Sequence, residues 1–414
     1  MPWRPSSASW VRRKASPGST ASRPQPPVPW RSETKSANTE AGSGVGISKQ
    51  TAAQTHRTRT KESRTGMAKK RLGIGILGTG WVAGAHIENF KKIDGCEIVG
   101  ICSRKQERAA AKIAEHQLVQ AESYEDYDAL LAREDLDIVV ICTPHPGHPN
   151  ETVAAAEAGK HIVIEKPVAM ERKSLERMLT AVEANKVNTS VCFELRWIGL
   201  FQNIKAMVKQ GLLGKLFYGE TGYFHGIGPW YGQYPWNRKK DMGGDAFLTA
   251  GCHALDGLIW LMDSKVVEVS AMSNTSPRNP LKYEYDTNIC AILRFENGAI
   301  GKVATSIECR QPYSFPVLLQ GDKGTIDGDK LSTLLWPGTS AGKWAQIPTA
   351  LPDSGDVDDH PYLGQLEYFV DCVRKKKRPH NDLKACSHVH EVMFAIQDAL
   401  KKRKTIPVPS TPGA

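Results

Sequence analysis

From residue 72 onward, short apolar runs alternate regularly with stretches of helical pattern. The apolar runs lie at 72–78, 97–103, 137–143 and 161–167, and the segments between them are long enough for helices. Strands that are apolar throughout are buried on both faces, which is typical of a parallel sheet covered by helices. This alternation predicts an α/β fold for the first part of the chain.

The first predicted strand runs directly into GTGWVAG, in which Gly78, Gly80 and Ala83 match the spacing G-x-G-x-x-G/A. The first glycine permits a tight turn, the second lets the backbone approach a pyrophosphate, and the alanine allows close packing of the helix. Because a strand precedes the motif and a helix follows it, we predict a Rossmann dinucleotide-binding domain. The alternative is a glycine turn in a domain without a ligand. The predicted cofactor-binding residues of the turn are Gly78, Thr79, Gly80, Trp81, Val82 and Ala83.

The second predicted strand ends in Ser103 and Arg104, where such domains usually have an acidic residue for the ribose 2′-hydroxyl. An arginine at this point can accept a 2′-phosphate instead. We therefore expect both residues to contact NAD(P), with a mild preference for NADP, although Arg104 could equally be a solvated surface residue.

The formal charge of +10 is concentrated at the amino end of the chain. Residues 1–66 contain 12 of the 54 Lys and Arg but only 3 of the 44 Asp and Glu, and they are rich in Ser, Thr and Pro. We expect a disordered basic tail, or a start of translation at Met67 that leaves these residues out of the protein. The rest of the chain is nearly neutral, which argues against nucleic-acid binding.

The nine cysteines are scattered, form no C-x-x-C pair, and in several cases lie inside apolar runs. This pattern favours reduced core thiols in a cytoplasmic protein and predicts neither a metal site nor disulfides. The sequence has no run approaching the ~18 apolar residues of a membrane span, so we expect no membrane association.

The segment 243–263, GGDAFLTAGCHALDGLIWLMD, places a cysteine directly before a histidine. Helical spacing puts Cys252 on one apolar face with Leu248 and Leu255, where a buried thiol is expected to pack rather than react. His253 points about 100° away from that face, since neighbours in a helix do not face each other. The spacing predicts that His253 finds its partners elsewhere in the chain.

The loop at 225–244 combines aromatic side chains with amide and guanidinium donors. Such a set suits a sugar ring, whose faces are apolar and whose rim is polar; the alternative is an ordinary aromatic packing cluster. The predicted substrate-binding residues in this loop are Trp230, Tyr231, Trp236, Asn237 and Arg238.

Three longer stretches share features with one protein family: TPHPGHPNETVAAAEAGKHIVIEKP, RWIGLFQNIKAMVKQGLLGKLFYGE and HPYLGQLEYFVDCV. With the glycine motif, they resemble the Gfo/Idh/MocA oxidoreductases over about residues 70–408. The resemblance implies a second α+β domain with a large open antiparallel sheet, which often forms homo-oligomers (dimers or tetramers). An Asn297-Gly298 hairpin signal and further glycine turns at 318–336 agree with such a sheet. We expect a tail at 1–66, a Rossmann domain at 67–190 and a substrate-binding and oligomerisation domain at 191–408.

The same resemblance implies roles for individual residues. Lys166 of the EKP motif lies beside the nicotinamide and the substrate hydroxyl, and His253 is the catalytic histidine. Thr249 stands where an aspartate is common, and a threonine carries no charge, so a mechanism that depends on that acid is in doubt. Arg196 lies where the family often has a substrate-facing residue, and His253 also faces the substrate. The implied cofactor contacts beyond the first two strands are Thr143, Pro144, His148, Glu165 and Lys166.

These observations favour an NAD(P)-dependent dehydrogenase or reductase acting on a CH–OH group of a sugar, polyol or glycoside. Hydride transfer from such a carbon needs a base for the hydroxyl proton and a cation for the developing alkoxide, which His253 and Lys166 supply. One alternative is glycoside cleavage through transient oxidation by a tightly bound NAD. A non-catalytic dinucleotide sensor is the weaker alternative, because a sensor needs neither side chain.

Overall fold

The computed structural model describes residues 71–226, 234–336, 338, 342–349 and 360–409. Contacts within the chain separate Met1–Thr65 from Gly66–Ala414, and the following description concerns the second unit. The predictions for the tail at 1–66 and for Trp230 and Tyr231 lie outside the described residues.

The first sheet is the predicted Rossmann sheet. In the described residues it has the strand order β3-β2-β1-β4-β5-β6, and every neighbouring pair is parallel. Its strands are β1 (Leu72–Leu77), β2 (Cys96–Cys102), β3 (Glu122–Tyr124), β4 (Ile138–Ile141), β5 (His161–Ile164) and β6 (Thr189–Val191). Its helices are α1 (Trp81–Phe90), α2 (Gln106–Glu115), α3 (Tyr127–Leu131), α4 (His148–Glu157) and α5 (Arg172–Asn185). The order reverses between β1 and β4, and in open α/β sheets a ligand binds at the carboxyl ends of the strands at that point.

The apolar runs form strands because both faces of the sheet are covered. Every residue of β1 and of β4 is buried, as expected for a run without alternation. The strands end earlier than the runs, because Gly78 turns the chain with a φ of +107° and the last residues of the EKP motif leave the sheet.

The second sheet is large and open, and the predicted antiparallel arrangement is wrong at one pair. Its order within the described residues is β14-β13-β12-β11-β7-β10-β9-β8-β15, with β7 and β10 parallel. This pair is parallel because a helix carries the chain back between β7 and β8, so β8 runs in the same direction as β7, and the antiparallel steps from β8 to β9 and from β9 to β10 then reverse the chain twice. The strands are β7 (Leu216–Phe224), β8 (Val266–Asn274), β9 (Asn288–Phe295), β10 (Ile300–Ser306), β11 (Val317–Gly321), β12 (Gly324–Asp327), β13 (Lys330–Thr333), β14 (Ala345–Gln346) and β15 (Ile406–Pro407).

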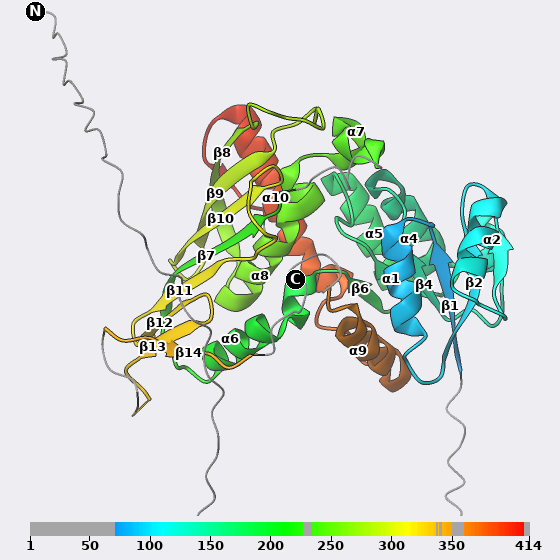
Figure 1. Cartoon of the computed structure of the whole chain (residues 1–414), viewed down its shortest axis with the longest axis horizontal. Coiled ribbons are helices and arrows are strands. Elements are labelled where there is room, and N and C mark those ends of the chain that lie inside the picture. The colour runs from blue at the N-terminus through cyan, green and yellow to red at the C-terminus, as the bar shows by residue number, and fades with distance from the viewer. Residues whose placement is uncertain (1–70, 227–233, 337, 339–341, 350–359, 410–414) are drawn as a thin grey trace, which may run out of the picture. The chain divides into compact units, whose positions relative to one another are not determined.

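One face of this sheet is covered by helices. Figure 1 shows α8 (Cys252–Met262) beside β7 and α10 (Leu383–Lys402) near β8, and both helices contact these strands; α6 (Gly199–Lys209) packs on α8. Burial alternates residue by residue along β9, so its other face is exposed. The predicted hairpin between β9 and β10 is confirmed, and Gly298 at its turn has a φ of +86°. In the described part of the chain, no helix has the length and apolarity that crossing a membrane requires.

The core of the first sheet includes a helix from late in the sequence. Helix α9 (Tyr362–Lys375) packs against α1, and Leu366, Phe369 and Val370 belong to the same buried cluster as Phe90. The domain boundary at residue 190 remains a prediction. Residues of α9, far beyond that boundary, complete the core of the first sheet.

Candidate functional site

The turn after β1 has the geometry that a dinucleotide requires. A Cβ on Gly78 would lie 2.7 Å from the carbonyl oxygen of Cys142, whereas at Gly80 none of the described atoms lies within 4 Å of that position. Helix α1 begins directly after Gly80, which provides no side-chain cap, and Ala83 is fully buried in the helix packing. The space at Gly80 and the uncapped helix end fit a pyrophosphate.

The neighbouring strand ends complete this edge of the sheet. Ser103 is half-buried and Arg104 is exposed directly after β2. After β4, the hydroxyl of Thr143 donates to Glu151, and Pro144 opens the following turn. His148 is fully buried, with its ring nitrogens 2.7 Å from the Thr143 carbonyl oxygen and 2.8 Å from that of Pro167. His148 therefore ties two loops together, which is a different role from the predicted contact with the cofactor.

The EKP motif reaches from the first sheet toward the helix that carries His253. The Glu165 carboxylate lies 2.9 Å from Nε2 of the buried His86 and accepts from the backbone N–H of Lys166 at 3.3 Å. The ammonium group of Lys166 donates to the carbonyl oxygen of Thr249 at 2.9 Å. Hydrogen bonds thus hold Lys166 both at its backbone N–H and at its side-chain ammonium.

One group of three described residues has the atoms for a metal ion: His86, Glu165 and Cys192. His86 and Glu165 already pair with each other, and burial raises the pKa of the Cys192 thiol well above its usual range. A protonated thiol is a poor ligand, so the arrangement is that of a hydrogen-bonded buried cluster.

The segment that carries His253 changes its winding. Residues Phe247–Gly251 form a π-helical turn, and α8 begins after it. The hydroxyl of Thr249 donates to the carbonyl oxygen of Gly243 at 3.0 Å and lies 3.2 Å from the Tyr285 hydroxyl. The side chain of Thr249 therefore bonds to Gly243 and lies against Tyr285, whereas its carbonyl oxygen accepts from Lys166.

Cys252 is confirmed as a buried residue. It is 0% exposed, and its thiol donates to the carbonyl oxygen of Leu248 at 3.5 Å. Burial raises the pKa of this thiol to about 12, so the nucleophilic thiolate is not available near neutral pH.

His253 lies in a buried polar cluster whose centre is Glu194. Nε2 of His253 is 3.3 Å from Oε1 of Glu194, and Nε2 of His360 is 2.6 Å from Oε2. The hydroxyl of Tyr313 donates to Oε1 at 3.1 Å. Burial acts to raise the pKa of Glu194, but its interactions with His253, His360 and Lys166 outweigh burial and hold the pKa at about 2. Burial lowers the pKa of His253 to about 3, with Glu194 acting in the opposite direction. Near neutral pH the cluster therefore holds a carboxylate beside a neutral imidazole.

The prediction that Arg196 faces a substrate disagrees with its contacts. Its guanidinium donates to both oxygens of Asp256, at 2.8 and 2.5 Å, and to the carbonyl oxygen of His380 at 2.9 Å. Both charged side chains are buried. The guanidinium of Arg196 thus donates to partners inside the protein.

The loop residues that were predicted to bind a sugar have mixed surroundings. Asn237 is buried, and its carbonyl oxygen accepts from the Tyr285 hydroxyl at 2.6 Å. Arg238 donates to the carbonyl oxygen of Leu281 at 2.9 Å. The half-buried Trp236 ring packs edge-on against the ring of His145, with 5.0 Å between the ring centroids. These contacts favour the packing-cluster alternative for Asn237 and Arg238.

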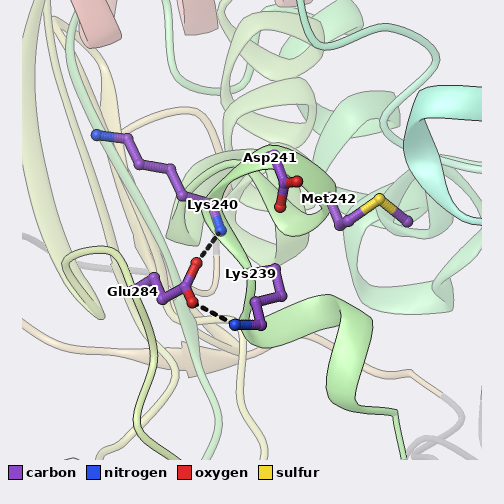
Figure 2. A pocket seen from close by; sticks show the side chains of 5 residues that line it. All are labelled: Lys239, Lys240, Asp241, Met242 and Glu284. Carbon is purple, nitrogen blue, oxygen red and sulfur yellow. Dashed lines mark hydrogen bonds and ion pairs between the residues drawn. The ribbon is translucent and has the colours of Figure 1, made fainter.

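An open pocket of about 540 Å³ lies beside this loop. Figure 2 shows Glu284 bound to two consecutive residues: its carboxylate accepts from the ammonium of Lys239 at 2.6 Å and from the backbone N–H of Lys240 at 3.1 Å. The pocket is lined by Lys239, Lys240, Asp241, Met242 and Glu284. Lys166 and His253 do not line it, so it is separate from the cluster around Glu194.

The sequence analysis did not identify three members of that cluster: Glu194, Tyr313 and His360. A signal was present for two of them. Glu194 stands two residues before Arg196, and His360 opens the motif HPYLGQLEYFVDCV. Tyr313, in the connection before β11, has no comparable signal.

Comparison with known proteins gives a consistent result. Residues 72–193 match the oxidoreductase family with an NAD-binding Rossmann fold, and residues 201–327 match the GFO/IDH/MocA C-terminal domain. The chain is 25% identical over 289 residues to a glycosyl hydrolase family 109 protein of Shewanella sp. (strain W3-18-1), covering 62% of this chain and 62% of the relative. It is 26% identical over 261 residues to myo-inositol 2-dehydrogenase of Thermotoga maritima, covering 63% and 76%.

A solved structure of levoglucosan dehydrogenase in complex with NADH has the same fold, with a TM-score of 0.74 at 20% identity. That match covers 83% of this chain and 100% of the other. The two family matches together span more than half of the chain. The protein therefore belongs to the GFO/IDH/MocA family and is an oxidoreductase with an NAD-binding Rossmann fold.

Proposed function

We propose that the protein is an NAD(P)-dependent dehydrogenase or reductase that transfers a hydride to or from a hydroxyl-bearing carbon of a sugar, polyol or glycoside. The observation that carries this proposal is the contact between the Lys166 ammonium and the carbonyl oxygen of Thr249, four residues before His253. It brings a cation from the nucleotide-binding sheet to the segment that carries a neutral imidazole. The names of the relatives, a myo-inositol dehydrogenase and a levoglucosan dehydrogenase, support the substrate class.

The chain's own residues have complementary tasks in this reaction. The nicotinamide supplies the hydride-accepting or hydride-donating carbon when it is bound. Lys166 orients the substrate oxygen and stabilises negative charge on it. In oxidation, His253 takes the hydroxyl proton as the carbon loses its hydride, and a carbonyl compound remains; in reduction, His253 returns the proton.

The test is turnover by variants of these two residues. Removing a positioned acid–base typically costs ~10²–10⁴-fold in rate, so His253→Asn and Lys166→Ala should each lose about this much while NADH still binds. Turnover is measured on a panel of three candidate substrates: myo-inositol, levoglucosan and an N-acetylgalactosaminide. The readout is the absorbance of the reduced cofactor. The neighbouring Cys252→Ala is the matched control and should stay within a few fold. Full activity of His253→Asn would contradict the proposal.

For the cofactor, we propose a preference for NADP. The exposed Arg104 directly after β2, and the absence of an acid at 103 and 104, support this preference. Fluorescence titration of both cofactors with the wild type measures it directly.

Glycoside cleavage with a retained NAD is the second candidate, supported by the similarity to a glycosyl hydrolase family 109 protein. Denaturing freshly purified protein and measuring the released nucleotide separates the two. About one NAD(H) per chain would favour the internal redox cycle, and empty protein would favour an exchanging dehydrogenase.

We also propose a cytoplasmic homo-oligomer that associates through the open face of the second sheet. Met272 of β8 is 82% exposed and Ile292 of β9 is 47% exposed on adjacent strands. All nine cysteines are free thiols, which supports a reducing compartment. Light scattering should give a dimer or tetramer, and Ile292→Lys should lower the mass toward that of a monomer.

A further inference from the structure

We propose that Glu194 and His253 work as one proton-accepting pair, in which Glu194 supplies from another element the negative charge that Thr249 lacks. This inference rests on the proposed role of His253 as the acid–base. The carboxylate comes from the turn Glu194–Trp197, directly beyond β6, and the imidazole comes from α8. Glu194 is a positioning residue, because it acts through His253.

Two polar contacts, one of them an ion pair, join the same two elements. Arg196, on the turn of Glu194, forks onto Asp256, which lies three residues after His253 on α8. The contact between Glu194 and His253 runs alongside it, at 3.3 Å between Oε1 and Nε2. The buried fork fixes the turn against the helix and so holds the carboxylate at the edge of the imidazole. This gives Arg196 a function that does not involve contact with a substrate.

The second oxygen of Glu194 is held as well. His360 lies 2.6 Å from Oε2, and the Tyr313 hydroxyl donates to Oε1. The carboxylate therefore cannot turn away from the ring without losing contacts that offset its burial. The charged and titratable groups that influence this pair are His360, Tyr313, Lys166 and Glu165.

The negative charge of Glu194 opposes the effect of burial on the pKa of His253. Burial depresses the proton affinity of His253, and a base works best when its pKa lies near the working pH. Glu194 acts against that depression. Before the reaction the pair carries one negative charge; after taking the hydroxyl proton it is neutral, so no net charge is created in a buried site. A bound nicotinamide would accept the hydride that the carbon loses.

A double-mutant cycle in kcat/KM tests the pair, using the panel substrate with the highest turnover. Glu194→Gln should lose about 10²-fold or more, the low end of the range for an acid–base. In the background of His253→Asn the same change should cost less than about 3-fold, because residues that act as a unit are not additive. The pH profile of kcat should also change its acidic limb in Glu194→Gln. The control is Glu391→Gln, which removes a buried carboxylate on α10 that pairs with Arg172 of α5, and its turnover should stay within a few fold.

A measurement without substrate completes the test. An ionised carboxylate beside Nε2 favours the proton on that nitrogen, so ¹⁵N NMR of histidine-labelled wild type should show His253 protonated on Nε2, with the signals assigned through His253→Asn. Glu194→Gln should shift this tautomer balance and also the signals of His360, which contacts the same carboxylate, while the remaining histidine signals stay in place.

The outcomes separate this inference from the proposed function. If His253→Asn retains turnover, the proposed function fails. If His253→Asn loses ~10²–10⁴-fold in rate but Glu194→Gln costs the same factor in both backgrounds, only the pair is overturned. An unchanged tautomer in Glu194→Gln also overturns it, whichever substrate is used.

Discussion

Replacing Arg196 with methionine should destabilise the fold and leave substrate affinity nearly unchanged. The substitution removes three hydrogen bonds and leaves Asp256, which is 0% exposed, without its counter-charge. Breaking one partner of a buried ion pair typically costs about 3–5 kcal/mol. We expect a loss of this size in the free energy of unfolding at pH 8.

The loss should depend on pH in a defined direction. Burial raises the pKa of Asp256, and Arg196 opposes that rise. Without Arg196 the carboxyl group takes up a proton more readily, and a neutral acid is cheaper to bury than a charge. The difference between wild type and Arg196→Met should therefore shrink as the pH falls from 8 toward 5.

Urea unfolding followed by tryptophan fluorescence measures both effects. The double variant Arg196→Met/Asp256→Leu removes both charges and should recover most of the lost stability. If Arg196→Met leaves the urea midpoint unchanged but raises KM about tenfold or more, the guanidinium faces the substrate and the reasoning from its buried contacts is refuted.

Four further predictions follow from single positions. Arg104→Ala should weaken NADP binding much more than NAD binding, because only NADP offers a 2′-phosphate; equal losses in fluorescence titrations would make Arg104 a general surface cation. Cys252→Ala should lose stability through a small cavity, measured by urea unfolding, and keep its turnover. Thr249→Asp places a carboxylate at a buried position whose hydroxyl now donates to a carbonyl oxygen, so it should lower the urea midpoint rather than tune His253; a shifted pH profile in a fully stable variant would contradict this. Burial lowers the pKa of His390 from 6.5 to about 4, so the stability it contributes is complete above pH 6.5 and falls by up to about 3 kcal/mol as the pH drops through 4, and His390→Gln should flatten this part of the stability curve.

The elements that depend on local pattern could be predicted from the sequence. Unbroken apolar runs gave the parallel strands, the spacing of Gly78 and Gly80 gave the cofactor turn, and Asn297-Gly298 gave the hairpin. In each case the side chains within a few residues determine the backbone conformation. The parallel pairing of β7 and β10 depends on the path of the whole chain, and no local pattern encodes it.

The site was predictable only in part, for the same reason. Lys166 and His253 carry recognisable motifs, but the partner of Arg196 lies 60 residues away in the sequence. The segment that carries Thr249 is wound as a π-helix, which the apolar spacing in 243–263 does not reveal. Glu194 stands only two residues before Arg196, but its importance arises from side chains on three other segments, which the sequence does not bring together.

The packing of α9 on α1 has a consequence for how the protein is made. Synthesis proceeds from the amino end, and domains generally fold as units as they emerge from the ribosome. Here the strands of the nucleotide-binding sheet emerge first, yet Phe90 is covered by a cluster that includes Leu366 and Phe369. The sheet is therefore complete but lacks α9 while residues 192–361 are synthesised, and its uncovered apolar flank is the kind of surface that chaperones bind. A ribosome that stalls before α9 would release a chain that already contains the whole glycine motif but not a finished core to support it.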